Sequence, residues 1–314
     1  MATVNVYIDG TTLSNSTAVY ADAGLTTCAT AGFYSDGTIS REQVIDAAGK
    51  CSLLPNQTCP SCVTECGGPT VSVSSGVTGY YILDIDTGGT STDTGAIVIS
   101  FNPASVPDGI RAVYNGVTYN KLSAPAYGKL QSTGVNDPFT FIGNAGDDCG
   151  LSGSSYTLDE YEYDGTSFVA TGNTQGITVN SVDVQLTATA PGLCVMVIPK
   201  PTASPSIIRI EIAAACAGTG FGITTACPTQ LTSFAASSRQ VSDVAACAET
   251  TYPVTLYNVP VTGTAGVPAL HDYVFTDASG QFAPADGFYK TVDAAVEYSI
   301  QVVDGIIDTV ITCP

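Results

Sequence analysis

The sequence predicts an all-β fold, and three observations support this prediction. Apolar residues make up 44% of the 314 positions and charged residues only 12%, so the chain can bury a core. Nearly every patterned stretch alternates between polar and apolar residues with a period of two, and β-branched and aromatic side chains dominate these stretches. Clusters of glycine, proline, asparagine and aspartate bound each stretch, as expected of strands joined by turns.

The length supports two or three domains, because one core typically organises roughly 100–200 residues. The alternating pattern breaks at Cys66-Gly67-Gly68-Pro69 and again at Cys227-Pro228-Thr229. We therefore predict a central jelly-roll-like β-sandwich over residues 67–228. A small β-meander module with a cysteine-rich linker is expected over 1–66, and a related module over 229–314.

Strands are expected wherever the alternation is clearest. Three hairpins are predicted from the turn pairs Asn115-Gly116, Asp164-Gly165 and Asp304-Gly305, which readily adopt the positive φ angles of tight turns. Short helices are expected only near 41–48 and 238–246. The predicted strands outside the hairpins are 80–85, 96–101, 182–187, 194–198 and 207–212.

The two terminal regions contain a diluted internal repeat. The stretch from Val19 to Tyr34 aligns without gaps on the stretch from Val274 to Tyr289. In each copy an apolar strand ends in Asp-Ala, a loop follows, and Gly-Phe-Tyr begins the next strand. We interpret the repeat as a shared small β-meander, which buries little by itself and should pack on a neighbour.

The charge balance argues against two classes of partner. With 9 Lys+Arg against 28 Asp+Glu, the formal charge is −19, which repels phosphate backbones and anionic lipid headgroups. We therefore expect no nucleic acid partner. We also expect no membrane insertion, since no run of about 18 apolar residues occurs. No leader is recognisable at Met1–Gly10, although the composition suits the outside of a cell.

The cysteines allow two interpretations. Cys51, Cys59, Cys62 and Cys66 could supply four thiolates to a zinc ion, but the usual second Cys-x-x-Cys pair is absent. Local disulfides or thiols are the alternative. The total of 11 is odd, so at least one cysteine lies outside any intrachain disulfide.

Two acidic loops are candidate calcium sites, because Ca²⁺ prefers six to eight oxygen ligands from such loops. The first loop contains Asp84, Asp86 and Asp93, and the second contains Asn144, Asp147 and Asp148. Neither has the spacing of a known calcium loop, and the alternative role for both is loop solubility. Apart from structural calcium, we expect no cofactor.

Sixteen tyrosines occur without any tryptophan. Aromatic faces can stack on sugars or pack against other proteins, so exposed tyrosines are candidates for a binding surface. Packing at sandwich edges or between subunits is the alternative. The candidates are Tyr119, Tyr127, Tyr156, Tyr161 and Tyr163.

We expect no enzymatic activity. The single histidine, His271, is the only imidazole base, and no nucleophile elbow or phosphate-binding loop is present. The acidic hairpin with Asp159, Glu160, Glu162 and Asp164 is interpreted as a solvated edge that discourages strand pairing, rather than as a glycosidase pair.

Several turn and strand motifs carry a resemblance to known proteins. They resemble β-sandwich domains of bacteriophage structural proteins, and related sandwiches of surface proteins of Bacteroidota. The end pieces look like small modules found in the same two settings. The motifs are Phe101–Ile110, Val113–Val117, Tyr163–Val169, Ala215–Phe221, Asp22–Tyr34, Asp277–Tyr289 and Cys313–Pro314.

The resemblance implies a structural component of a tailed bacteriophage particle: a head decoration, a head fibre or a tail appendage. Such a protein would be made in the host cytoplasm and located in the virion, with other virion proteins and copies of itself as partners. Attachment to host-surface glycans is a further implied role. The alternative is a secreted or cell-surface bacterial adhesin or carbohydrate-binding protein, which could be calcium-dependent.

Overall fold

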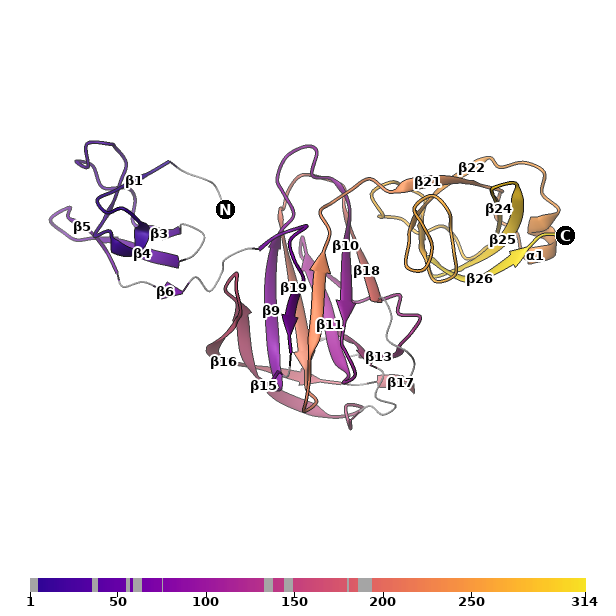
Figure 1. The fold of residues 1–314 in the computed structure, drawn as a ribbon, viewed down its shortest axis with the longest axis horizontal. Coiled ribbons are helices and arrows are strands. Elements are labelled where there is room, and N and C mark those ends of the chain that lie inside the picture. Colours follow the sequence, from indigo (N-terminus) through magenta and orange to yellow (C-terminus); the bar gives the residue numbers. More distant parts are fainter. Residues whose placement is uncertain are drawn as a thin grey trace. The chain divides into compact units, whose positions relative to one another are not determined.

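The computed structural model describes residues 5–35, 39–54, 57–58, 64–74, 76–132, 138–143, 149–179, 181–185 and 194–314. The chain divides into two compact units. The first comprises Met1–Val63 with Tyr161–Thr171, and the second comprises Thr64–Glu160 with Gly172–Pro314. The second unit contains both a β-sandwich and a C-terminal β-barrel (Figure 1). The all-β prediction is confirmed.

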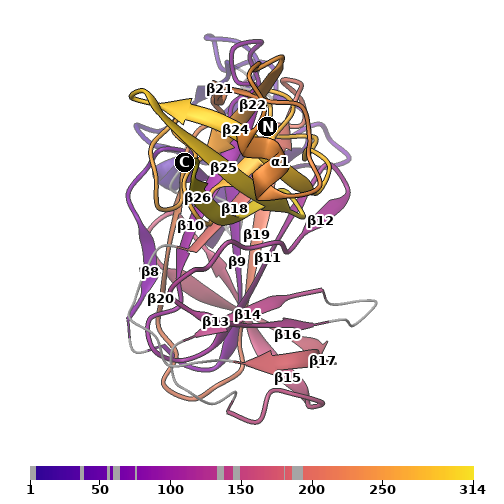
Figure 2. The ribbon, with the colours of Figure 1, turned by 90° about the vertical axis from the view of Figure 1, so that its right-hand side faces the viewer.

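Eight strands of the second unit form a jelly roll. Numbered one to eight along the chain, they lie in one sheet as 6-3-8-1 (β18-β10-β20-β8) and in the other as 2-7-4-5 (β9-β19-β11-β14). Two sheets with this order are the two interlocked Greek keys of a jelly roll, as predicted. Strands β8 and β20 run side by side at the sandwich edge (Figure 2). The strands are β8 (Val71–Val73), β9 (Gly79–Asp86), β10 (Gly95–Asn102), β11 (Asp108–Tyr114), β14 (Thr140–Gly143), β18 (Cys194–Lys200), β19 (Ile207–Ala214) and β20 (Phe221–Thr225).

Insertions between jelly-roll strands widen the second sheet at both edges. The hairpin of β15 and β16 extends it beyond β9, while β13 and β17 extend it beyond β14. Strand β12 pairs with β11, and β7 pairs in parallel with β9. These strands are β7 (Thr64–Glu65), β12 (Val117–Tyr119), β13 (Gly128–Ser132), β15 (Ser155–Tyr163), β16 (Phe168–Thr178) and β17 (Ser181–Gln185). Of the predicted strand 182–187, the structure describes the part up to Gln185, which belongs to β17.

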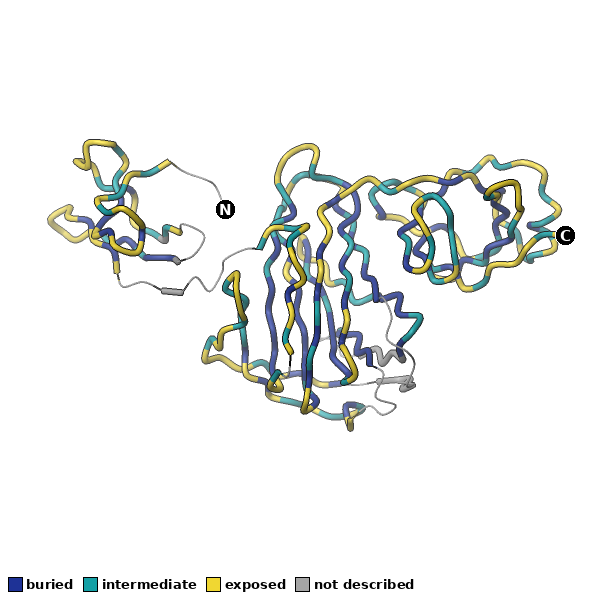
Figure 3. The backbone as a smooth tube through the Cα atoms, viewed as in Figure 1, coloured by how far each residue is buried: buried dark blue, intermediate teal, exposed yellow. Residues whose placement is uncertain are grey.

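The alternation of the jelly-roll strands places one face of each strand in the core. Ile97, Ile99 and Phe101 of β10 are at most 1% exposed, while Val98 and Ser100 between them are half-buried. The same alternation continues on the neighbouring strands, so the centre of the sandwich is buried along its length (Figure 3). Cores of this kind supply most of the free energy that stabilises a β-sandwich.

The C-terminal region closes into a six-stranded barrel, where the sequence had suggested only a small meander. Its strands follow the order β21-β22-β23-β26-β25-β24, and the pair Ala236–Thr291 closes the ring. Leu256, Val274, Ile300 and Ile307 pack in its interior. The elements are β21 (Thr232–Ala236), α1 (Asp243–Cys247), β22 (Val254–Val259), β23 (Tyr273–Phe275), β24 (Gly287–Asp293), β25 (Val296–Val303) and β26 (Ile306–Thr312). Helix α1 lies at the end of the predicted helical stretch 238–246, and Ser242 caps it through the backbone N–H of Ala245.

An apolar seam joins the barrel to the sandwich within the second unit. Val195 of β18 packs in one cluster with Val259, Val261, Tyr273 and Phe275 of the barrel. The Tyr273 hydroxyl donates a hydrogen bond to the Val195 carbonyl at 3.0 Å. Apolar contacts and this hydrogen bond therefore connect the sandwich to the barrel across the seam.

Two polar contacts border this seam. The Ser123 hydroxyl donates to the carbonyl of His271 at 2.7 Å, and Lys121 forms an ion pair of 2.9 Å with Asp304. His271 itself adopts a φ of 72° in the connection that leads into β23. The single histidine therefore lies in a structural turn.

The N-terminal module is a small set of short antiparallel strands. Its elements are β1 (Tyr7–Ile8), the 3-10 helix η1 (Leu13–Asn15), β2 (Val19–Tyr20), β3 (Gly32–Ser35), β4 (Ile39–Ile45), β5 (Cys51–Leu53) and β6 (Gln57–Thr58). The predicted helix near 41–48 is wrong, since β4 occupies most of that range. Arg41 and Gln43 of β4 are buried and donate hydrogen bonds to backbone carbonyls of neighbouring segments. These contacts stabilise a strand here, although both residue types favour helices by intrinsic propensity.

The internal repeat is visible in the geometry of its equivalent residues. Asp22 accepts hydrogen bonds from the backbone N–H groups of the residues four and five positions later, and so does Asp277. Gly32 and Gly287 have φ angles of 149° and 153°, which favour glycine. The hydroxyls of Tyr34 and Tyr289 each donate to the carbonyl four residues earlier. The two stretches therefore build the same local structure.

Candidate functional site

The three acidic residues of the first predicted calcium loop do not converge. Asp84 forms a bidentate ion pair with Arg209, with both N–O distances 2.8 Å. Asp86 accepts from the backbone N–H of Gly88 at 2.9 Å, and Asp93 accepts from the backbone and hydroxyl of Thr90. Within the described residues, no group of three or more His, Cys, Asp or Glu could hold a metal ion.

A lysine ammonium lies where a calcium ion was expected. Lys200 is fully buried, and its Nζ donates to the carbonyls of Gly88, Asp93 and Ala203. Burial lowers the pKa of Lys200, while the nearby charges of Asp93 and Asp86 oppose this shift. The ammonium thus organises the loop by binding the oxygen atoms that a cation would bind. The second predicted loop, with Asn144, Asp147 and Asp148, lies outside the described residues.

The four-cysteine zinc site is not formed. Cys51 is in a disulfide with Cys28, and Cys66 is in a disulfide with Cys227. A sulfur atom in a disulfide is not a thiolate and cannot serve as a zinc ligand of the expected kind. The other two members of the predicted set, Cys59 and Cys62, lie outside the described residues.

Two further disulfides join Cys149 to Cys216 and Cys247 to Cys313. Cys194 is buried in β18 and belongs to none of the four. The four disulfides among the described residues indicate an oxidising environment. No helix in the described part of the chain is long and apolar enough to cross a membrane.

The five candidate tyrosines do not form one exposed surface. Tyr127 is only 5% exposed, and its hydroxyl donates to the Asn102 side chain at 3.0 Å, so its predicted exposure is wrong. Tyr156 packs against the sandwich core and donates to the Gly150 carbonyl. The remaining three, Tyr119, Tyr161 and Tyr163, are half-buried.

In the acidic hairpin of β15 and β16, Glu160 departs from the solvated edge that the sequence predicted. Glu160 is buried and accepts hydrogen bonds from the side-chain amides of Asn173 and Gln175. Asp164 accepts from Thr166 and from the backbone N–H of Ser167, which folds a wider loop than the predicted two-residue turn. Both carboxylates therefore have structural partners.

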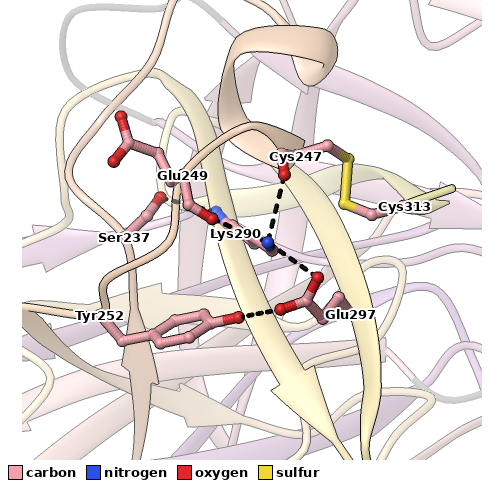
Figure 4. A network of polar contacts seen from close by, with 7 residues as sticks. All are labelled: Ser237, Cys247, Glu249, Tyr252, Lys290, Glu297 and Cys313. Carbon is pink, nitrogen blue, oxygen red and sulfur yellow. Dashed lines mark hydrogen bonds and ion pairs between the residues drawn. A yellow bond between two sulfur atoms is a disulfide. The ribbon is translucent and has the colours of Figure 1, made fainter.

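A lysine-centred network on the outer face of the barrel is fully paired (Figure 4). The Nζ of Lys290 donates to the carbonyls of Cys247 and Glu249 and forms an ion pair of 2.8 Å with Glu297. The hydroxyl of Tyr252 donates to the other Glu297 oxygen at 2.7 Å. The hydrogen bond to Glu297 raises the pKa of Lys290, and the same bond lowers the pKa of Glu297.

This network has a structural role. Each N–H bond of the lysine has an acceptor, so its amine is not available as a nucleophile. A cation that binds carbonyls at the end of α1 stabilises the last turn of the helix. Together with the disulfide between Cys247 and Cys313, the network holds the segment around α1 against β24 and β25.

One pocket lies at the mouth of the C-terminal barrel. It has a volume of about 230 Å³ and is lined by Val267, Pro268, Ala269, Leu270, Thr291, Asp293, Tyr298 and Val310. On β24, Thr291 and Asp293 lie on the same face as the interior residue Tyr289, because side chains alternate along a strand. The pocket therefore continues the barrel interior to the surface, at a position where barrels often bind small ligands.

The wall of this pocket is fixed by a buried carboxylate. Asp272 is fully buried and accepts hydrogen bonds from the backbone N–H groups of Val261, Thr262, Gly263 and Ala269. These bonds fold the segment between β22 and β23 back over the barrel mouth. The lining residues from Val267 to Leu270 are thereby held in place by the fold.

Two polar side chains of the pocket are unpaired in the part of the chain that the structure describes. The Asp293 carboxylate and the Tyr298 hydroxyl form no hydrogen bond or ion pair with any described residue. The rest of the lining is apolar except for Thr291, whose hydroxyl donates to the Ala235 carbonyl. An apolar pocket with one unpaired carboxylate and one unpaired phenol can hold a small ligand with an apolar body and a polar end.

The tip of the hairpin beside the pocket has an unusual backbone. Ala294 and Ala295 join β24 to β25 with φ angles of 46° and 69°, a conformation that asparagine and glycine favour. Val292 and Val296 flank this turn and are exposed. The pocket at the barrel mouth was not predicted from the sequence. Two alanines at the tip of the neighbouring hairpin are unusual for a turn and could have indicated it.

No family model, no curated protein and no solved structure matches this chain.

Proposed function

We propose that the chain is a non-enzymatic structural component of an extracellular particle, for which a tailed bacteriophage virion is the leading candidate. Its work is cohesion between protein subunits. One observation carries the proposal: a disulfide-linked jelly roll contacts a barrel through an apolar seam and is preceded by a module that repeats part of that barrel. Repeated docking modules on a stable core suit a protein that connects neighbours.

Three features support this role over catalysis. The buried charged groups Lys200, Lys290 and Asp272 are each satisfied by structural partners in the described chain. The single histidine lies in a turn at the seam. The jelly roll also occurs in viral capsid proteins, which supports the virion by analogy of fold alone.

Electrostatics suit a particle protein as well. A formal charge of −19 keeps a densely packed surface soluble and repels packaged nucleic acid. Partners of this protein should therefore offer basic or apolar surfaces. Four disulfides suit persistence outside the cell.

Mass spectrometry of purified virions, combined with cross-linking, tests the proposal. We expect the protein at high copy number, with cross-links from its terminal modules to other particle proteins or to further copies of itself. Detection only among secreted or cell-surface proteins would contradict the virion role. Binding to a glycan array together with absence from particles would instead favour an adhesin or carbohydrate-binding protein.

A further inference from the structure

We propose that the pocket at the barrel mouth binds the aliphatic ammonium side chain of a lysine presented by a partner protein. The pocket is built on β24, β25 and β26 and on the segment fixed by Asp272. It exists before any ligand binds, so little ordering is needed on binding.

The size of the pocket fits one long side chain. Its volume of about 230 Å³ lies below the roughly 300–1,000 Å³ of pockets that hold drug-sized ligands. This is enough for a lysine side chain and too little for an ordinary drug-sized ligand.

The chemistry of the lining selects the two ends of such a side chain. Val267, Pro268, Leu270 and Val310 offer apolar surface to a chain of methylene groups. The carboxylate of Asp293 pairs with no cation among the described residues, and Tyr298 lines the same pocket. A carboxylate and an electron-rich ring both attract an ammonium group and repel an anion.

Charge on the larger scale favours the same partner. The chain has 28 acidic and 9 basic residues, so a lysine-bearing surface is drawn towards it from a distance. Ala294 and Ala295, which follow Asp293 in the chain, are exposed and have small apolar side chains, so another protein can approach closely there. The backbone there is strained, and such strain concentrates at functional sites.

The test is a titration of the full chain, followed by NMR spectroscopy, with lysine blocked as its Nα-acetyl and N-methylamide derivative. We expect saturable shifts confined to the pocket, with a dissociation constant of roughly 1 mM, as is usual for a single side chain. Added salt should weaken binding. The equally blocked norleucine, which lacks the ammonium group, should bind at least about tenfold more weakly.

Two variants localise the effect. Asp293→Asn should weaken binding of blocked lysine about tenfold, because it removes the one carboxylate among the described residues that line the pocket. Asp308→Asn is the matched control, since this exposed aspartate lies on β26 but does not line the pocket. It should leave binding unchanged. Circular dichroism and spectra outside the pocket check that both variants fold.

Four results would overturn the proposal. The first is equal binding of blocked lysine and blocked norleucine, and the second is an equal loss of binding in Asp293→Asn and Asp308→Asn. The third is tighter binding of blocked arginine than of blocked lysine, and the fourth is binding of free diamines without binding of blocked lysine. The choice of a lysine carried by a protein rests on the proposed assembly role. The binding of an ammonium group by the pocket does not rest on that role. A failed titration would therefore contradict the pocket, whereas absence from virions would contradict the assembly role.

Discussion

Buried charged side chains in the described chain differ in whether their hydrogen-bonding capacity is met. Lys200 donates to three carbonyls, and Asp272 accepts from four backbone N–H groups. Asp108 is different: one of its oxygens accepts from Thr219, while the other, Oδ2, is buried without a partner. Burial raises the pKa of Asp108 well above its ordinary value of 3.8.

The raised pKa of Asp108 makes stability depend on pH. The protonated form is favoured in the folded state, so its contribution is complete below pH 3.8 and is lost as pH rises towards the folded pKa. We expect Asp108→Asn to become progressively more stable than the wild type as pH rises, by up to about 1.4 kcal/mol per pH unit. Urea unfolding between pH 4 and pH 8 measures this difference. A difference that stays constant with pH would contradict the raised pKa, and Asp308→Asn serves as the exposed control.

Removal of the Lys200 ammonium should destabilise the loop that it organises. Lys200→Met keeps the apolar stem but leaves three carbonyls without their donor, and we expect a loss of about 3 kcal/mol in the free energy of unfolding. Lys121→Met, at a lysine side chain that is 40% exposed, should cost at most about 1 kcal/mol.

The same loop makes a prediction about calcium. Because Lys200 already binds the loop carbonyls, millimolar Ca²⁺ or a chelator should leave the melting temperature of the wild type unchanged. Differential scanning fluorimetry measures this directly. A rise in melting temperature with Ca²⁺ would show that calcium binds the folded chain after all.

At the scale of elements, the hairpins show how turn composition and tertiary structure interact. Asn115-Gly116 and Asp304-Gly305 adopt positive φ angles, as their residue types predict. Ala294-Ala295 adopts the same geometry without the residues that favour it. The strands β24 and β25, paired from Gly287–Val302 to Asp293–Val296, impose this turn on the alanines.

Relief of this strain should stabilise the barrel. We expect Ala294→Asn combined with Ala295→Gly to raise the free energy of unfolding by about 2 kcal/mol, because left-handed alanine costs about 1 kcal/mol per residue. The reverse change, Asn115→Ala with Gly116→Ala, is the matched control and should lose a similar amount, since an added Cβ at Gly116 meets no neighbour. Chemical denaturation measures both, and an unchanged stability of the Asn-Gly variant would show that the turn is not strained.

At the scale of the whole molecule, the seam between sandwich and barrel decides cooperativity. Tyr273 lies at its centre: the ring packs with Val195 and Phe275, and the hydroxyl donates to two carbonyls of the sandwich. Burial raises the pKa of Tyr273, so the hydroxyl stays protonated and can donate across the physiological range. The N-terminal module belongs to a separate compact unit.

Calorimetry should therefore show two unfolding transitions in the wild type, one for the N-terminal module and one shared by sandwich and barrel. Tyr273→Ala should split the shared transition, because it removes the seam's central ring and costs about 3–5 kcal/mol. Tyr273→Phe keeps the ring and should lower the transition temperature without splitting it. Separate sandwich and barrel transitions in the wild type would contradict a rigid seam.

Most strands of the jelly roll could be predicted from the amino-acid sequence, because alternation between polar and apolar side chains is a local property that shows which face of a strand is buried. The alternation did not reveal β4, which was predicted as a helix. The repeat could be recognised in the sequence for the same reason, because Asp22 and Asp277 each fold their loop through hydrogen bonds to residues only a few positions away. The groups that meet from distant parts of the chain could be identified only from the folded arrangement. It paired Cys66 with Cys227, placed Lys200 in the expected calcium loop, and closed the barrel whose mouth forms the pocket. Such contacts depend on the order of strands in space, which periodicity along the chain does not encode.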